Sequence, residues 1–303
     1  MLGSADPPNP RSGLDRLIQG SAGAKMKVNS FALEGHRMTR RLCLITGASA
    51  GIGAAMARVF AKAGYDVALT ARRTEKLEAL ADEIRMRFGV ETYVISADLA
   101  DPGASDQILA ALANEGRVVD ALVNNAGYGL AGTYANTSWT DQGAFLQVLL
   151  VAVAELSHKV LPGMLDRRFG RIINVASLAG LVPGSAGHTL YGATKSFLVK
   201  FSQSLHLETA ATGIHVTALC PGFTYSEFHD VNATRDLVSK ATPAWLWLGA
   251  DEVAAEGFEA VEANRAVCVT GAPNKAIAVL AKILPDDWAL ALMARSAGRF
   301  RNL

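Results

Sequence analysis

Three side chains in the sequence have the types and the spacing needed for proton transfer to an oxygen: Ser177, Tyr191 and Lys195. Tyr191 and Lys195 are four residues apart, so in a helix they lie about one turn apart on the same face. The pKa of a free tyrosine is about 10, and a neighbouring ammonium lowers the cost of forming the phenolate. We therefore expect Tyr191 to exchange a proton near neutral pH, with Ser177 orienting the reacting oxygen. A tyrosine and a lysine also share helix faces by chance, so this interpretation depends on the rest of the chain.

A glycine-rich segment far upstream, Thr46-Gly-Ala-Ser-Ala-Gly-Ile-Gly53, stands between a short apolar run and a helical pattern. Glycines allow the backbone to approach a pyrophosphate closely, and the free N–H groups at a helix N-terminus attract phosphate. In this context the segment predicts a dinucleotide-binding loop. Its spacing is Gly-x-x-x-Gly-x-Gly rather than Gly-x-Gly-x-x-Gly.

Strand and helix patterns alternate around these residues without hairpin signals, which indicates parallel βαβ units with right-handed crossovers. We expect a single Rossmann-type doubly wound α/β domain, with a parallel sheet of about seven strands and helices on both faces. The expected strands are 41–46, 67–70, 92–96, 121–123, 171–175, 215–219 and 266–270. The expected helices are 54–63, 74–88, 104–115, 142–167, 191–211 and 251–264.

The length of 303 residues fits one such domain with an extension at each end. Residues 1–38 are rich in Gly, Ser, Pro and Arg and are predicted to be a flexible extension, with a docking arm as the alternative. Met26 or Met38 could be the start of translation. Residues 39–272 are the predicted dinucleotide-binding and catalytic domain, including a substrate lid at 223–250. Residues 273–303 are a predicted helical extension.

The composition points to a small-molecule partner. Lys and Arg number 29 and Asp and Glu 28, so the chain lacks the basic excess typical of nucleic-acid binding. Cys43, Cys220 and Cys268 lie in apolar strand-like runs without metal-ligand spacing, which predicts reduced core thiols in a cytoplasmic protein and no metal site. No stretch approaches the roughly 18 uninterrupted apolar residues of a membrane span, so none is expected.

Five motifs occur in the order seen in short-chain dehydrogenases/reductases, and residues 40–272 resemble that family. The motifs are the glycine segment from Thr46 to Gly53, Asn124-Asn125-Ala126-Gly127, Ser177, Tyr191-x-x-x-Lys195 and Pro221-Gly222. The resemblance implies an oxidoreductase that interconverts a carbonyl compound and an alcohol by hydride transfer. It also implies that Tyr191 exchanges the proton with the substrate oxygen, that Ser177 holds this oxygen, and that Lys195 binds the nicotinamide ribose and lowers the tyrosine pKa.

The residue that closes the second strand indicates the cofactor. In the family an acidic residue there selects NAD, whereas this chain has Ala71, followed by Arg72 and Arg73. A guanidinium pairs well with a phosphate, so Arg72 predicts NADP(H) in preference to NAD(H). Two solvated arginines at a helix start are the alternative, and Ala50 weakens the prediction because relatives that prefer NADP often carry a basic residue there.

The resemblance assigns a further set of residues to cofactor binding. For Asp98, which stands where the family has an adenine-contacting aspartate, helix capping by Asp98 or Asp101 is the alternative. The full set of implied cofactor contacts is Gly47, Ser49, Gly51, Ile52, Gly53, Arg72, Asp98, Leu99, Asn125, Ala126, Gly127, Tyr191, Lys195, Pro221, Gly222 and Thr224.

The sequence departs from the family at one position of the long helix before the fifth strand. Many relatives carry an asparagine there, which helps to hold a water that links the lysine to solvent. Counting between the flanking motifs places Leu149 at this position, and neither Gln147 nor Glu155 matches it. Either a backbone carbonyl holds the water, the proton relay takes another route, or catalysis is impaired.

Residues 223–248 interrupt the alternation of strands and helices, and the resemblance places them over the nicotinamide. They contain Phe223, Tyr225, Phe228, Trp245 and Trp247, with Ser226 where a carboxamide-binding threonine is common. An aromatic lid suits an apolar substrate, and packing within the protein's own core is the alternative. Tyr128 and His188 are candidates for the pocket wall, although His188 is better explained as a loop residue.

We therefore predict an NADP-dependent short-chain dehydrogenase/reductase that acts on the CH–OH group of an apolar small molecule. The alternative is a catalytically impaired cofactor-binding sensor or scaffold, for which Leu149 is the motive. The resemblance further implies a homodimer or homotetramer built through the long helices, with the apolar stretch 148–156 as a candidate contact.

Overall fold

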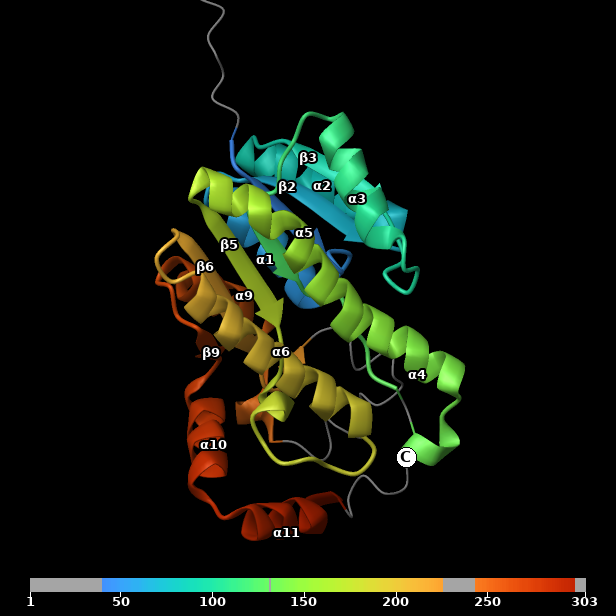
Figure 1. Ribbon diagram of the computed structural model, residues 1–303, viewed down its shortest axis with the longest axis vertical. Helices are drawn as coiled ribbons and strands as arrows, with labels where there is room; N and C mark the ends of the chain where they lie inside the picture. Colours follow the sequence, from blue (N-terminus) through green and yellow to red (C-terminus); the bar gives the residue numbers. More distant parts are fainter. Residues whose placement is uncertain (1–39, 131, 226–242, 298–303) are drawn as a thin grey trace, which may run out of the picture. The chain divides into compact units, whose positions relative to one another are not determined.

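The computed structural model describes residues 40–130, 132–225 and 243–297 of the chain. In this part of the chain, the main sheet has seven parallel strands in the order β3-β2-β1-β4-β5-β6-β9 (Figure 1). The direction in which strands are added reverses between β1 and β4, so the sheet is doubly wound as predicted. The strands are β1 (Leu42–Thr46), β2 (Asp66–Ala71), β3 (Thr92–Ser96), β4 (Ala121–Asn124), β5 (Gly170–Val175), β6 (Ile214–Cys220) and β9 (Val267–Val269).

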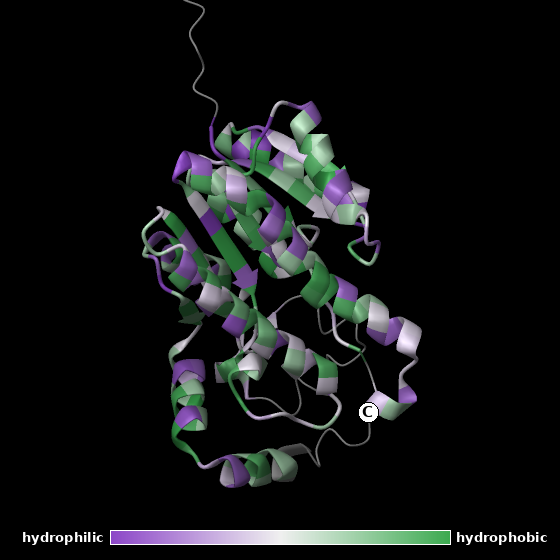
Figure 2. Ribbon diagram, viewed as in Figure 1, coloured by the Kyte–Doolittle hydropathy of each residue, from purple (hydrophilic) through white to green (hydrophobic). Residues whose placement is uncertain are grey.

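Helices cover both faces of the sheet. One face packs against α1 (Gly51–Lys62), α2 (Thr74–Phe88) and α9 (Ala250–Glu262). The other face packs against α3 (Ala104–Asn114), α4 (Trp139–Leu146), α5 (Ala152–Arg167) and α6 (Thr189–Glu208). Because both faces are covered, the strands carry long apolar runs, which are green in Figure 2. Every residue of β1 is buried. The predicted Rossmann-type fold is confirmed.

Two boundaries differ from the prediction in ways that matter for the site. The first helix begins at Gly51 rather than at residue 54, so the last two glycines of the loop lie inside its first turn. The helix predicted for 142–167 consists of α4 and α5 joined by a π-helical turn at Gln147–Val151. A π-helical turn takes one residue more than an α-helical turn. Residues 148–154 are all apolar, so the sequence pattern gives no sign of the extra residue.

The chain divides into residues 1–39 and 40–303. The predicted flexible extension 1–38 lies outside the described residues, and its separation from the domain stays a prediction. Beyond β9 the chain forms α10 (Ala272–Ile283) and α11 (Asp286–Ala297). A two-stranded ribbon of β7 (Thr224–Tyr225) and β8 (Leu248–Gly249) stands at the predicted lid.

The helical run Trp139–Arg167 is long and apolar enough to cross a membrane, with 29 residues and a mean hydropathy of 1.6 over its most apolar window. Within the protein, however, 44% of that window is buried. Phe145, Leu149 and Leu156 of this run belong to the core on the second face of the sheet. Core helices of soluble proteins meet the same length and hydropathy criterion, and we assign the run to the core.

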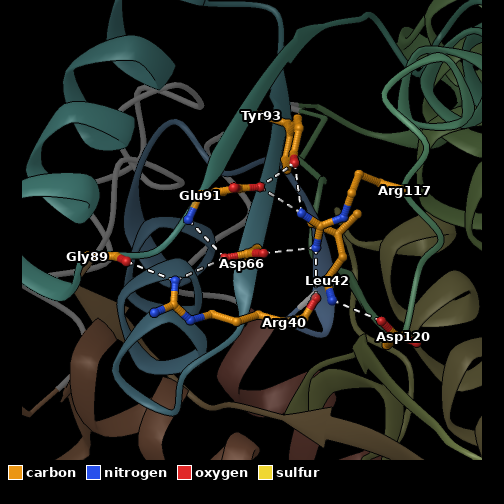
Figure 3. Close-up of polar contacts among 8 residues, drawn as sticks. All are labelled: Arg40, Leu42, Asp66, Gly89, Glu91, Tyr93, Arg117 and Asp120. Carbon is orange, nitrogen blue, oxygen red and sulfur yellow. Dashed lines mark hydrogen bonds and ion pairs between the residues drawn. The ribbon is translucent and has the colours of Figure 1, made fainter. Parts of the chain in front are cut away.

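A buried ion pair joins the amino ends of the strands (Figure 3). Arg117 donates hydrogen bonds to the Asp66 carboxylate at 2.9 Å, the Glu91 carboxylate at 3.0 Å, the Tyr93 hydroxyl at 2.7 Å and the Arg40 carbonyl at 2.8 Å. The side chains of Arg117 and Asp66 are only 8% and 3% exposed. Breaking such a buried pair costs about 3–5 kcal/mol. These contacts hold β1, β2 and β3 together at their amino ends, which lie at the opposite end of the sheet from the candidate site.

Candidate active site

The glycine segment forms a cradle between β1 and α1 that leaves no room for extra side-chain atoms. Gly47 and Gly51 have φ angles of 65° and 55°, in the left-handed region that favours glycine. A Cβ on Gly53 would lie 2.5 Å from the amide nitrogen of Asn125 and would also collide with the Gly47 carbonyl. Asn125 closes the cradle by donating from Nδ2 to the carbonyls of Thr46 at 3.0 Å and Gly47 at 3.1 Å.

Thr46 connects the cradle to the loop that follows β4. Its Oγ1 accepts hydrogen bonds from the backbone N–H groups of Asn125 at 2.9 Å and Ala126 at 3.0 Å, and donates to the Val123 carbonyl at 3.3 Å. The predicted residues Asn125, Ala126 and Gly127 therefore lie beside the glycine segment at the point where the strand order reverses. Ligands bind at such a switch point in doubly wound sheets.

The N-terminus of α1 is suited to a phosphate. Its N-cap residue, Ala50, makes no side-chain capping bond, and the first turn carries no acidic residue. The N–H groups that open the helix thus keep their partial positive charge. A guanidinium of the following βα unit reaches the same loop, because Arg73 Nη2 donates to Ser49 Oγ at 2.9 Å.

Arg72 lies on the side of the site that includes Tyr128. Burial raises the pKa of the Tyr128 phenol, and the positive charge of Arg72 opposes that increase. Asp98 makes a turn rather than a helix cap: its Oδ1 accepts from the Ala100 N–H at 3.0 Å, whereas α3 begins only at Ala104. Leu99 is buried, at 7% exposed.

Ser177, Tyr191 and Lys195 come together beyond the carboxyl end of β5. Ser177 caps the short 3₁₀-helix Leu178–Gly180, and its Oγ accepts an N–H from that helix at 3.1 Å. Tyr191 and Lys195 lie in the first two turns of α6. Gly180 allows the close approach, because a Cβ there would lie 2.6 Å from the backbone carbonyl of Lys195. A side-chain hydrogen bond joins Tyr191 to Ser177.

The protonation of this group is controlled by burial. Lys195 is 5% exposed, its Nζ donates to the Val175 carbonyl at 2.7 Å, and burial lowers its pKa to about 8. Its Nζ lies 5.7 Å from the centroid of the Tyr191 ring. Burial raises the pKa of Tyr191, and the hydrogen bond with Ser177 acts in the opposite direction. Burial thus outweighs the lowering that we expected from the ammonium, because exclusion of water disfavours both charged forms.

A chain of buried polar side chains holds the elements that carry these residues. Asn124 Nδ2 donates to Ser157 Oγ at 3.1 Å and to Asn174 Oδ1 at 2.8 Å. Asn174 Nδ2 donates in turn to Ser202 Oγ at 2.9 Å. All four are at most 2% exposed. The chain joins β4, β5, α5 and α6, and so fixes the strand that leads to Ser177 against the helix that carries Tyr191.

Leu149 lies within the π-helical turn Gln147–Val151 and is 1% exposed. Its side chain packs toward the loop after β4, since a Cβ on Gly127 would lie 3.6 Å from Leu149 Cγ. The two polar residues nearby have other structural roles. The Gln147 carbonyl accepts the Ala152 N–H across the wide turn, and Glu155 binds Lys159 at 2.6 Å.

A small cavity of about 30 Å³ adjoins Tyr191. Its wall includes Leu130, Phe145 and Leu190 together with the polar residues Gln142 and His188. Gln142 is 4% exposed and donates from Nε2 to the carbonyls of Tyr134 at 2.9 Å and Thr137 at 3.0 Å, which fixes the loop over the cavity.

The two residues that the sequence suggested for the pocket wall have different positions. His188 is exposed and lines the cavity, with its ring centroid 6.2 Å from that of Tyr191. Tyr128 packs edge-on against Phe145 at 5.5 Å and thus supports the wall.

A family model for short chain dehydrogenases matches residues 41–236 of the sequence. The chain belongs to the short-chain dehydrogenase family. The sulfoacetaldehyde reductase of Chromohalobacter salexigens is 37% identical over 221 residues, which are 71% of this chain and 85% of that protein. The NADP-dependent 3-hydroxy acid dehydrogenase YdfG of Escherichia coli (strain K12) is 36% identical over 197 residues, or 64% and 77% of the two chains.

A solved structure reported for 7β-hydroxysteroid dehydrogenase stereoselectivity matches this fold with a TM-score of 0.75 and 29% identity, covering 85% of this chain and 98% of that one. The predicted membership of the short-chain dehydrogenase family is thus confirmed, and so is the predicted class of enzyme.

The described part of the lid in this short-chain dehydrogenase carries an aromatic stack. Trp247 lies 4.9 Å from Tyr225 and 5.5 Å from Phe223, measured between ring centroids. Thr224 Oγ1 donates to the Gly222 carbonyl at 3.2 Å, which shapes the start of the lid. Ser226 and Phe228 lie outside the described residues.

Within the described ranges, no group of three or more His, Cys, Asp or Glu side chains is arranged to hold a metal ion. The three cysteines are buried free thiols, as the sequence analysis predicts. Burial raises the pKa of each, that of Cys220 to about 12.

Sequence reasoning missed three residues of the site. Arg73 was not distinguished from Arg72, although the serine in the glycine segment gives it a partner. Gly180 carries no sequence signal, because its importance comes from its contact with α6. The sequence predicts Gln142 only as the start of a helix. The apolar stretch proposed as a subunit contact is mainly core, because within 148–156 only Val151 is a large exposed hydrophobic residue, at 41%.

Proposed function

We propose that this protein interconverts a carbonyl compound and an alcohol, using NADP(H) in preference to NAD(H). The observation that carries the proposal is the hydrogen-bonded pair Ser177 and Tyr191, with the Lys195 ammonium behind it, beside a glycine cradle at the switch point of the sheet. When bound, the nicotinamide supplies or accepts the hydride. The alternative of a catalytically impaired sensor or scaffold has no observation in its favour beyond Leu149.

The residues of the cradle fit a dinucleotide. Glycine at position 53 lets α1 pack closely on the loop, because a Cβ there would collide with Gly47 and Asn125. The N-terminus of α1 is free of capping side chains, as a pyrophosphate at this N-terminus requires. Gly47, Ser49, Gly51 and Ile52 would hold the pyrophosphate side of the cofactor. The adenosine side and the middle of the cofactor would be held by Asp98, Leu99 and the loop Asn125-Ala126-Gly127. Pro221, Gly222 and Thr224 would hold the nicotinamide end.

The preference for NADP(H) rests on two guanidinium groups. β2 ends at Ala71, so no carboxylate stands at this end of the strand, and Arg72 follows directly. Arg73 contacts the glycine segment through Ser49. A 2′-phosphate at this point would meet positive charge, which favours the phosphorylated cofactor. The name of the relative YdfG includes NADP dependence, which supports the same preference.

The catalytic roles follow from position and protonation. Tyr191 is protonated near neutral pH, so in the direction of carbonyl reduction it donates its phenolic proton to the substrate oxygen. Ser177, already hydrogen-bonded to the tyrosine, would hold the same oxygen. Lys195, with a pKa of about 8, keeps its proton below that pH and presents a positive charge 5.7 Å from the tyrosine ring. The charge favours the phenolate that remains after the transfer.

We infer that the backbone, rather than a side chain, serves the proton relay at Leu149. A helix that changes from an i+4 to an i+5 pattern and back leaves one carbonyl without a helical N–H partner. The π-helical turn Gln147–Val151 therefore offers an acceptor for a water at the position where relatives carry asparagine. The intact Ser177, Tyr191 and Lys195 agree with an active enzyme.

The substrate is proposed to be apolar. Leu130, Phe145 and Leu190 contribute to the cavity beside Tyr191, and the aromatic stack of the lid adds further apolar surface. The two relatives described above are named for acidic compounds, so a decisive screen contains both kinds of substrate. We further propose a cytoplasmic homo-oligomer, by analogy with the family.

Turnover by the full-length protein tests the proposal. Oxidation of NADPH and reduction of NADP⁺ are measured with a panel of apolar ketones, aldehydes and alcohols and with sulfonated and carboxylated aldehydes. Tyr191→Phe should lose at least about 10²-fold in kcat, because general acid catalysis contributes typically 10²–10⁴, while it retains NADPH affinity. If this variant kept more than about a tenth of the wild-type kcat, the role of Tyr191 would be wrong.

A further inference from the structure

The first turn of α10 rests on the Pro221-Gly222 turn. Asn274 lies in this first turn and is 2% exposed, and its Nδ2 donates to the Thr270 carbonyl at 2.9 Å. A Cβ on Gly222 would lie 2.5 Å from Oδ1 and 2.6 Å from Cγ of Asn274, and the three nearest atoms all belong to that side chain. The Asn274 amide is therefore in direct contact with the backbone of Gly222.

Backbone hydrogen bonds connect this contact to the catalytic group. The carbonyl of Pro221 accepts the Leu178 N–H at 2.9 Å, and Leu178 directly follows Ser177. The carbonyl of Gly222 accepts from Thr224 Oγ1 at 3.2 Å at the base of the lid. A displacement of the Gly222 backbone would therefore reach both Ser177 and the lid.

The position of Asn274 is itself fixed from outside the site. Glu256 of α9 accepts the Gly271 N–H at 3.1 Å and the Lys275 ammonium at 3.3 Å. Both partners of Glu256 flank the first turn of α10, which follows β9 in Figure 1. Glu256 thus fixes the start of α10, from which the amide of Asn274 reaches the Pro221-Gly222 turn.

We propose that Asn274 is a positioning residue that sets the Pro221-Gly222 turn, and through it the nicotinamide end of the cofactor site and Ser177. This inference rests on the proposed function. Asparagine suits the position because one face of its planar amide can lie flat against a glycine while its donor is held by the Thr270 carbonyl. Alanine would remove this support, and a larger side chain would displace the turn.

The first experiment compares Asn274→Ala with Val279→Ala in the full-length protein. Asn274→Ala should raise the Kd and the KM for NADPH about tenfold, whereas the KM for the carbonyl substrate at saturating NADPH should change less than about twofold. Val279 lies in the same helix, is 59% exposed and takes no part in the contacts described above, so its variant should leave these constants unchanged. A melting temperature for each variant separates a local effect from unfolding.

The second experiment uses the collision at Gly222. Gly222→Ala should lose activity and NADPH affinity, because its new methyl group meets the Asn274 amide. In the double variant Gly222→Ala/Asn274→Ala the methyl group gains space, so kcat/KM for NADPH should recover at least about threefold over Gly222→Ala alone. If Gly222 and Asn274 acted independently, their losses would add and the double variant would be worse than Gly222→Ala.

The proposal is overturned if Asn274→Ala keeps its NADPH Kd within about twofold of wild type, or if the double variant is no better than Gly222→Ala. Should Asn274→Ala fail to fold, Asn274→Ser, which retains a donor for the Thr270 carbonyl, takes its place in both comparisons. NADPH binding, followed by its fluorescence, is read without turnover. A wild type that binds NADPH but reduces no substrate would contradict the proposed function and still leave the Asn274 test intact.

Discussion

Replacement of Leu149 by asparagine tests whether the proton relay needs a polar side chain. Because Leu149 is 1% exposed and packs in the core, the substitution removes apolar contacts worth about 2–5 kcal/mol. It also leaves an amide with unmet hydrogen bonds, at a cost of about 1–3 kcal/mol. Together these costs are about 3–8 kcal/mol. We expect the melting temperature to fall by about 6–32 °C, since 1 kcal/mol corresponds to roughly 2–4 °C for a domain of this size.

The turnover number should respond far less than the stability. If a carbonyl of the π-helical turn holds the relay water, Leu149→Asn should change kcat by less than about tenfold, or about 1.4 kcal/mol in the barrier. The assay is NADPH oxidation with the best substrate from the screen, at a temperature well below the melting point of the variant. Leu149→Met keeps the volume of the side chain and serves as the matched control. A gain of several hundredfold in kcat for Leu149→Asn alone would show that the relay is broken in the wild type and would refute the reasoning.

Three further outcomes are expected. Arg72→Ala should raise the KM for NADPH much more than that for NADH, and Arg73→Ala should do so to a smaller extent because its contact runs through Ser49; equal affinities of the wild type for both cofactors would contradict the assignment. Because burial lowers the pKa of Lys195 to about 8, kcat/KM for reduction should fall as the pH rises through about 8. The stability should change with pH in the opposite direction. The pKa of lysine in the unfolded chain is about 10.4, so between about pH 8 and pH 10 the unfolded chain binds more protons than the folded protein. The contribution of Lys195 to the free energy of unfolding should therefore increase from about pH 8 upward. A pH profile of kcat/KM together with denaturant unfolding at each pH checks both signs. Removal of residues 1–37 should leave activity and melting temperature nearly unchanged, because the first strand begins at Leu42; a large drop in melting temperature would show that the segment packs on the protein.

The parts of the site that could be predicted from the sequence are those whose physical cause is local. The glycine spacing after an apolar run and the Tyr191-x-x-x-Lys195 spacing depend only on neighbouring residues. Gly180 and Asn274 are different, because their importance comes from a backbone that lies across a packed interface and leaves no periodic signal in the chain. The pKa of Tyr191 was misjudged for a similar reason. The sequence indicates which charge stands nearby, whereas the extent of water exclusion depends on the packing of α6, β5 and the 3₁₀-helix.

The wide turn between α4 and α5 also sets the relative phase of the two helices. Each residue advances an α-helix by about 100°, so one inserted residue rotates everything that follows by about that angle. Before the turn, Gln142 and Phe145 face the cavity beside Tyr191, and after it Ser157 faces the buried amide of Asn124. In a continuous α-helix of the same sequence, the residues after the turn would be rotated by about 100° from the directions that they have here. A single-residue deletion within Gln147–Val151 would therefore be absorbed by conversion of the wide turn to an ordinary α-helical turn, whereas a deletion elsewhere in the run would rotate one of these faces away from its partners.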